Sequence, residues 1–164
     1  MHPAFGHLLT PRWWLRRRFP PASLAAITAA IEAAERQHAG EIRFAIETCL
    51  NLADLRHPDG GQRRALELFS QLGIWDTAGN NGVLIYVLLA GHSIHIVADR
   101  GFTGRVSAAE WAAVCRLMEA EFRAGRFEAG AVAGVAAVSA LIGRHFPPGA
   151  GDRNELPDAP VIIG

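Results

Sequence analysis

The sequence predicts an α/β fold, a three-layer α/β/α sandwich around a small mixed sheet, with the element order α-α-β-α-β-β-α-α. Segments whose apolar residues recur every three or four positions alternate with short apolar runs that are typical of strands. The first two runs, 41–48 and 83–90, flank a helical segment, so they should be parallel with a right-handed crossover. The third run, 93–98, follows the second closely and predicts a hairpin.

The N-terminal part of the chain predicts two helices. Thr10 is suited to cap a short helix with Pro11 in its first position, and the Phe-Pro-Pro segment at 19–21 ends that helix. A longer helix over 22–38 carries apolar residues at three- and four-residue steps and ends at Gly40.

The central part of the chain predicts most of the sheet. Residues 41–48 alternate apolar and polar over their first half, which predicts the first strand. A helix over 62–72 follows and stops at Gly73. The run 83–90 is continuously apolar, so we expect this strand to be buried on both faces.

The register of the hairpin follows from its turn. A two-residue turn at 91–92 would pair Ala90 with Ser93. Continuing that register along both strands places Leu84 opposite Asp99 and Val83 opposite Arg100.

The sequence after the sheet predicts two more helices and a tail. A capping box at 107–110 opens a helix that ends at Gly125, and a last helix covers 127–142. Residues 147–164 are rich in Pro, Gly and Asp and are expected to form a flexible tail. The alternative for part of this tail is that 160–163 docks as an edge strand.

The composition indicates one globular domain, placed at 22–146 between an Arg/Trp-rich segment at 1–21 and the tail at 147–164. Hydrophobic residues make up 50% of the 164, and the sixteen basic residues, all arginine, balance sixteen acids. This balance excludes a strongly basic nucleic-acid binder. The absence of lysine excludes Schiff-base chemistry and a P-loop lysine.

The expected location is cytoplasmic, with peripheral contact to a membrane as an alternative. The chain start lacks the basic segment and apolar run of a secretory signal. The apolar stretches 83–90 and 129–143 are shorter than the roughly twenty residues that span a bilayer. Cys49 and Cys115 do not suggest a disulfide framework and are interpreted as buried thiols of a reducing compartment.

One end of the predicted sheet gathers polar side chains. The loop 76–82 enters the second strand and the loop 99–105 leaves the third, so the hairpin places them side by side, near the start of the first strand. Asp76, Asn80 and Asp99 offer the hard oxygens that suit Ca²⁺ or Mg²⁺. Ordinary turns are the alternative interpretation. The neighbouring candidates for binding an anion or a partner are Glu41, Asn81, Arg100 and Thr103.

A second candidate surface lies in the predicted first helix. Arginine and tryptophan suit the interfacial region of a membrane. A packed helix with one solvated face is the alternative. The candidate membrane or partner surface consists of Arg12, Trp13, Trp14, Arg16, Arg17 and Arg18.

Four segments between residue 40 and about residue 142 carry a family resemblance. They are Gly-Glu-Ile at 40–42, the stretch 68–75 followed by Asn-Gly-Val-Leu at 81–84, Gly-Phe-Thr-Gly at 101–104, and the stretch 122–130. In their order and spacing the sequence resembles the TPM domain, most closely its soluble-type bacterial members. The resemblance implies an α/β/α fold and, in some members, a divalent-cation site, commonly for calcium, with acid phosphatase activity. Other members act as accessory proteins, in photosystem II repair or as receptor auxiliary subunits.

Two departures from the family pattern bear on that cation site. Asn80 stands where the family often has Asp, and the stretch 99–104 lacks an acid that the family often carries. Asp99 is gained there, together with the positive charge of Arg100. Because ligand charge governs affinity for Ca²⁺, we expect at most weak binding of Ca²⁺ or Mg²⁺.

Two hypotheses for function follow. The favoured one is a non-catalytic interaction or accessory protein of a membrane-associated process, with a protein partner. The lost acids, the lack of a nucleophile constellation and the Arg/Trp segment support it. The alternative is a divalent-cation-dependent phosphatase of phosphomonoesters, with Arg100 holding the phosphate and the ligands named above holding the metal.

Overall fold

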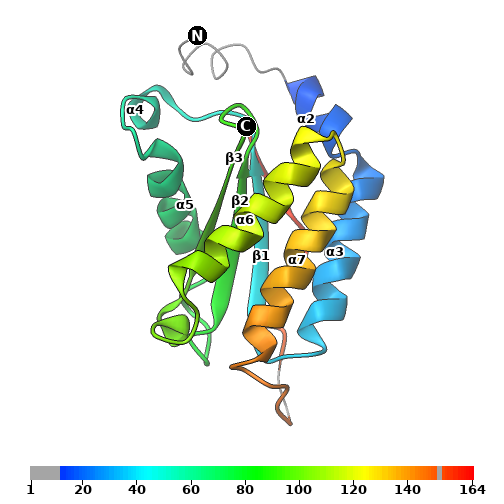
Figure 1. The fold of residues 1–164 in the computed structure, drawn as a ribbon, viewed down its shortest axis with the longest axis vertical. Coiled ribbons are helices and arrows are strands. Elements are labelled where there is room, and N and C mark those ends of the chain that lie inside the picture. The colour runs from blue at the N-terminus through cyan, green and yellow to red at the C-terminus, as the bar shows by residue number, and fades with distance from the viewer. Residues whose placement is uncertain (1–11, 151–152) are drawn as a thin grey trace.

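The computed structural model describes residues 12–150 and 153–164, apart from the side chain of Arg12, so Thr10 and Pro11 lie outside the described residues. A four-stranded mixed sheet has the strand order β3-β2-β1-β4. Helices α3, α6 and α7 cover one face of the sheet, and α5 with the short α4 lies on the other (Figure 1). In chain order the elements are α2 (Arg12–Arg18), α3 (Pro21–Glu35), β1 (Glu41–Glu47), α4 (Leu52–Leu55), α5 (Gly60–Gln71), β2 (Gly82–Leu88), β3 (Ser93–Ala98), the 3₁₀ turn η1 (Arg100–Phe102), α6 (Ala108–Arg123), α7 (Phe127–Gly143) and β4 (Val161–Ile163).

The predicted fold class is confirmed. The eight predicted elements occur in the predicted order, and α4, η1 and β4 are additional. Strands β1 and β2 are parallel, with Glu41 opposite Gly82, and β2 and β3 are antiparallel. The three layers of the predicted sandwich are visible in Figure 1.

Local sequence signals set several helix ends. Pro21 opens α3, where its missing N–H costs nothing because the first turn has no partner for it. The N–H of Glu110 donates to Ser107 Oγ and the N–H of Ser107 donates to the Glu110 carboxylate, which completes the predicted capping box of α6. Gly125, at a φ of 77°, follows the end of α6 in a conformation that favours glycine.

The hairpin register differs from the prediction by two residues. Ser93 pairs with Leu88 instead of Ala90, so the connection is four residues long. The N–H of Leu89 donates to the carbonyl of Glu47, the last residue of β1, and the N–H of Ala90 donates to the carbonyl of Thr48. This pairing with β1 removes them from the hairpin. Because side chains alternate with a period of two, the shift leaves every side chain on its predicted face.

The main core lies between the sheet and the layer of α3, α6 and α7. Ile42, Phe44 and Ile46 of β1 project into it, and so do alternate residues of β2. A smaller apolar cluster under α5 contains Ala45, Tyr86 and other side chains of the opposite sheet face. As predicted, β2 is buried on both faces.

Strand β1 is also buried along its whole length, although its alternating pattern is typical of a half-exposed strand. Its polar side chains are covered by the C-terminal segment. The carboxylate of Glu41 accepts the N–H groups of Glu155 and Leu156 at 3.0 and 3.1 Å. The guanidinium of Arg43 donates to the carbonyl oxygens of Pro157 and, at 3.1 Å, Ala159.

The prediction of a flexible tail over 147–164 is therefore corrected for its last residues. Val161–Ile163 form β4, which pairs in parallel with β1 at the edge of the sheet. The alternative of an edge strand at 160–163 describes this segment better. Glu41 and Arg43 of β1 hold the segment in place through its backbone groups. The sequence of the segment carries no pattern that would indicate this docking.

The two cysteines are free. The sequence predicts that Cys49 and Cys115 are buried, whereas in the structure both are half-buried. Burial raises the pKa of the Cys115 thiol to about 11, so it stays protonated at neutral pH. None of the helices in the described part of the chain has both the length and the apolar character that a membrane crossing requires.

We predict that Glu41→Ala loosens the C-terminal segment. Two N–H groups lose their acceptor, so the free energy of unfolding should fall by about 1–3 kcal/mol. Amide exchange at Glu155 and Leu156 should become faster, as measured by hydrogen-exchange NMR. Glu32→Ala, which removes an exposed carboxylate, is the control and should change neither quantity. Unchanged exchange at both amides in the Glu41 variant would contradict the assignment.

Candidate functional site

The loops before β2 and after β3 meet at one end of the sheet. The N–H of Asp99 donates to the carbonyl of Gly82, and the N–H of Gly101 donates to the carbonyl of Asn80 at 2.9 Å. The Nε of Arg100 donates to Asn80 Oδ1 at 2.9 Å. The predicted residues Asn80, Asp99 and Arg100 are thus neighbours. The two-residue difference between the predicted and the observed hairpin register does not separate these loops. Both loops still lie at the end of the hairpin opposite to its turn.

The other predicted loop residues have separate structural roles. Glu41 binds the C-terminal segment. Asn81 donates through Nδ2 to the carbonyl of Ala39 at 2.7 Å, tying the loop to the start of β1. Asp76 is exposed in the turn after α5, and Thr103 is exposed where η1 ends. The contacts of these four residues therefore do not bring their side chains to a common point.

A cavity of about 580 Å³ opens beside Glu41, between the end of α3 and the C-terminal segment. Glu35, in the last turn of α3, accepts the N–H of Ile42 at 2.8 Å through Oε1. Its Oε2 is buried. Burial, opposed by the Ile42 hydrogen bond and reinforced by the charges of Glu41 and Asp158, raises the pKa of Glu35 to about 8. Burial lowers the pKa of Arg43 from its usual value, and the charges of Asp158 and Glu35 oppose that shift in part.

Sequence reasoning missed this pair of acids. Glu35 is one of several polar residues near the end of α3, and Asp158 belongs to the segment that was expected to be a tail. No spacing rule links two acids at such a distance along the chain. Only the docking of the C-terminal segment against β1 brings them together.

The helix α2 packs against the domain with one face. Leu15 and Phe19 are buried in the main core. The ring of Trp14 meets His92 edge-on at 6.1 Å, and the guanidinium of Arg18 lies 3.2 Å from the centre of the Trp14 ring. Trp14 and Arg18 therefore face the domain.

The remaining predicted residues of this surface point outward. Trp13 is 59% exposed, and Arg16 and Arg17 are exposed as well. The side chain of Arg12 is outside the described residues. One face of α2 thus packs on the domain, and the solvated face contains Trp13, Arg16 and Arg17.

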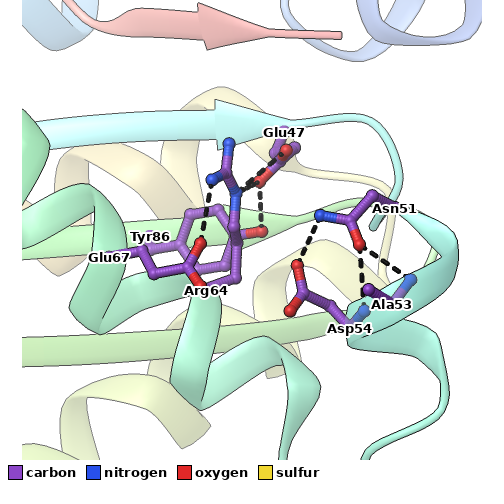
Figure 2. Close-up of polar contacts among 7 residues, drawn as sticks. All are labelled: Glu47, Asn51, Ala53, Asp54, Arg64, Glu67 and Tyr86. Atoms are coloured by element: carbon purple, nitrogen blue, oxygen red, sulfur yellow. Dashed lines mark hydrogen bonds and ion pairs between the residues drawn. The ribbon is translucent and has the colours of Figure 1, made fainter.

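A buried polar network lies on the face of the sheet under α5. The carboxylate of Glu47 accepts the Tyr86 hydroxyl at 2.7 Å and Arg64 Nε at 3.0 Å, and Arg64 also bonds Glu67 (Figure 2). Burial and the neighbouring Glu47 carboxylate raise the pKa of Tyr86 well above its usual range, so its hydroxyl remains a donor. Nearby, Asn51 caps α4 (Figure 2). Because the donors satisfy Glu47, we interpret this network as a structural brace between β1, β2 and α5.

Comparison with known families gives a match over most of the chain. A model of the TPM domain matches residues 17–141. The chain belongs to the TPM domain family. The match begins in the last residues of α2 and ends near the end of α7, so it spans β1 to β3 and all three long helices on the main-core face. A search of curated proteins gives no match.

The fold is shared with solved structures, two of which are compared with this chain. One is the NMR structure of the BA42 protein from the psychrophilic bacterium Bizionia argentinensis, with a TM-score of 0.75 and 29% identity, covering 86% of this chain and 92% of that one. The other is the solution NMR structure of the N-terminal domain of a protein from P. gingivalis, with a TM-score of 0.61 and 19% identity, covering 79% and 82%. The second likeness concerns the fold alone.

In this TPM domain the loop side chains do not match a divalent-cation site. Asn81 Oδ1 and Asp99 Oδ2 are buried and lack hydrogen-bond partners among the described residues. However, the other Asp99 oxygen accepts the N–H of Arg100, and the guanidinium of Arg100 occupies Asn80 Oδ1. In the described part of the chain, no three or more His, Cys, Asp or Glu side chains are grouped to hold a metal ion. Ca²⁺ takes six to eight oxygen ligands, and the bond from Arg100 to Asn80 Oδ1 removes one of the predicted ligands from such a set.

We predict that Glu35 makes stability depend on pH. Folding raises the pKa of Glu35 from 4.5 to about 8. Between these two pH values the folded state holds a proton that the unfolded state has lost. The stabilisation is complete below about pH 4.5 and is lost as the pH rises through about 8. Glu35→Gln keeps an acceptor for Ile42 and cannot titrate, so its melting temperature should fall less between these pH values. Equal pH profiles of the two proteins would contradict the prediction.

Proposed function

We propose that this TPM domain is a non-catalytic interaction domain that serves a membrane-associated process, with the outer face of α2 in contact with an anionic membrane surface. The observation that carries the proposal is the one-sided packing of α2. Leu15 and Phe19 fix the helix to the domain, while Trp13, Arg16 and Arg17 face away from it. A protein partner would be bound at the membrane surface.

The chemistry of the outer face suits the proposed contact. Tryptophan favours the headgroup level of a bilayer, and each arginine near an anionic surface contributes about 1 kcal/mol. Neither Arg16 nor Arg17 forms an ion pair with a described acid, so both charges are available. Because α2 is anchored before any contact, little ordering is needed when the surface binds.

The loops at the other end of the sheet support a non-catalytic role. Glu41 is committed to backbone donors of the C-terminal segment, and one oxygen of Asp99 is committed to Arg100. Asn80 is committed to the Arg100 guanidinium. These contacts stabilise the local fold and leave no activated nucleophile among them.

We predict that the triple variant Trp13→Ala, Arg16→Gln, Arg17→Gln loses binding to anionic vesicles. Loss of the two charges alone should weaken partitioning by about 30-fold. The measurement is co-sedimentation of the full chain with phosphatidylglycerol-containing vesicles, compared with pure phosphatidylcholine. Point variants are preferred to deletion of the segment, because Phe19 belongs to the core.

The matched control is Trp75→Ala, Arg56→Gln, Arg116→Gln. It removes one exposed tryptophan and two exposed arginines from other parts of the surface, so the change in charge is the same. This control should sediment like the unmodified protein. No binding by the unmodified chain, or equal loss in both variants, would overturn the proposal and direct the search to a soluble protein partner.

The alternative is a divalent-cation-dependent phosphatase acting on phosphomonoesters. The observation that favours it is the pair of buried oxygens without donors, Asn81 Oδ1 and Asp99 Oδ2. A cation or a water molecule would satisfy them. Against it stands the guanidinium of Arg100, which already bonds the adjacent Asn80.

A calcium titration followed by heteronuclear NMR separates the two functions. With the interaction domain, we expect no saturable shifts at residues 76–82 and 99–104, and no turnover of a generic phosphomonoester. Saturable shifts at both loops, together with turnover that Asp99→Ala abolishes, would establish the phosphatase instead. Turnover that survives Asp99→Ala would exclude these loops as its site.

A further inference from the structure

We propose that the pocket between the β2–β3 hairpin and the junction of α6 and α7 binds a single-chain carboxylate amphiphile, with the acyl chain inside and the carboxylate at Arg18. The pocket lies at the end of the sheet opposite to the loops described above, and next to α2. It uses none of the residues of the proposed membrane-contacting face. The two proposals can therefore fail separately.

The interior of the pocket is apolar. Its volume is about 440 Å³, which falls within the range of small-molecule pockets, roughly 300–1,000 Å³. Val87, Leu89, Ile94, Phe122 and Phe127 line it. All five belong to the main core or pack against it, so the pocket reaches inward from the surface. An extended acyl chain would gain by the burial of its methylene groups, at about 0.8 kcal/mol each.

The mouth of the pocket is cationic. Arg18, Arg123 and His92 line the pocket with the single acid Glu119. Arg123 bonds Glu119 at 3.2 Å, which leaves Arg18 as the arginine at the mouth without an ion-pair partner among the described residues. Charge complementarity therefore selects an anionic head group, and a guanidinium binds a carboxylate in two parallel hydrogen bonds.

The guanidinium of Arg18 is held in place before any ligand binds. It lies 3.2 Å from the centre of the Trp14 ring and 5.1 Å from that of Phe127. These contacts restrain the Arg18 side chain beside the pocket that it lines, so little conformational entropy is lost on binding. Burial and the neighbouring Arg17 lower the pKa of Arg18, and the negative charge of a bound anion would oppose this lowering.

The test uses dodecanoate below its critical micelle concentration and the full chain. We expect saturable binding by titration calorimetry, with chemical-shift changes at the lining residues Val87, Leu89 and Ile94. A dodecanoate analogue with a spin label near the end of its chain should broaden the same signals. Dodecanol, with the same chain and no charge, should bind at least about tenfold more weakly.

Arg18→Gln is the deciding variant, and Arg116→Gln, on α6, is its matched control. Arg18→Gln should weaken dodecanoate binding about tenfold or more and leave dodecanol unaffected, because only the charged head group loses its partner. Arg116, which is exposed and does not line the pocket, should be replaceable without effect on dodecanoate binding. Circular dichroism should show both variants folded.

Equal affinities for dodecanoate and dodecanol would overturn the proposal. So would an Arg18→Gln variant that binds dodecanoate normally, or shifts confined to the outer face of α2. Dodecyl phosphate serves as a comparison of head groups: tighter binding than dodecanoate would overturn the carboxylate assignment. Loss of vesicle binding by the triple variant with dodecanoate binding retained would show that the two surfaces act independently.

Discussion

The rest of this structure depends on β1, a strand that carries charged side chains into the interior. It is buried along its whole length, yet Glu41, Arg43 and Glu47 project from the face opposite the main core. A buried charge without a partner costs several kcal/mol, on the order of 3–5 kcal/mol when a pair is broken. Each of these charges has partners, and those partners determine which segments can cover this face.

The partners are of two kinds. Glu41 and Arg43 bind backbone groups, so they require a segment with free N–H and carbonyl groups, and the C-terminal segment before β4 supplies both. Glu47 binds side chains, the Tyr86 hydroxyl and the Arg64 guanidinium, and thereby fixes α5. The short edge strand β4 follows from the first arrangement, because its three pairs with β1 extend a segment that is already held. The two kinds of contact together complete the second layer of the sandwich.

This architecture separates two ends of different chemistry. At the end where β1 begins lie the polar loops, the raised pKa of Glu35 and the large polar cavity. Near the other end lie α2 (Figure 1) and an apolar pocket whose lining includes Arg18 of α2. The phosphatase hypothesis belongs to the first end, and the interaction and ligand hypotheses belong to the second. The loop side chains at the first end bond one another and the C-terminal segment. We therefore favour the interaction and ligand hypotheses at the second end.

The sequence by itself determined the element order, the parallel crossover, the faces of the strands and the meeting of the two loops. These features depend on periodicity, caps and chain handedness, which are local, and a two-residue register shift does not alter them because strands repeat every two residues. Only the tertiary structure decided the fate of the charges on β1, the pairing of Glu35 with Asp158, the docking of β4 and the division of α2 into a packed and an exposed face. The reason is distance along the chain: Glu41 finds the N–H of its partner Glu155 114 residues away, and no local pattern specifies such a partner.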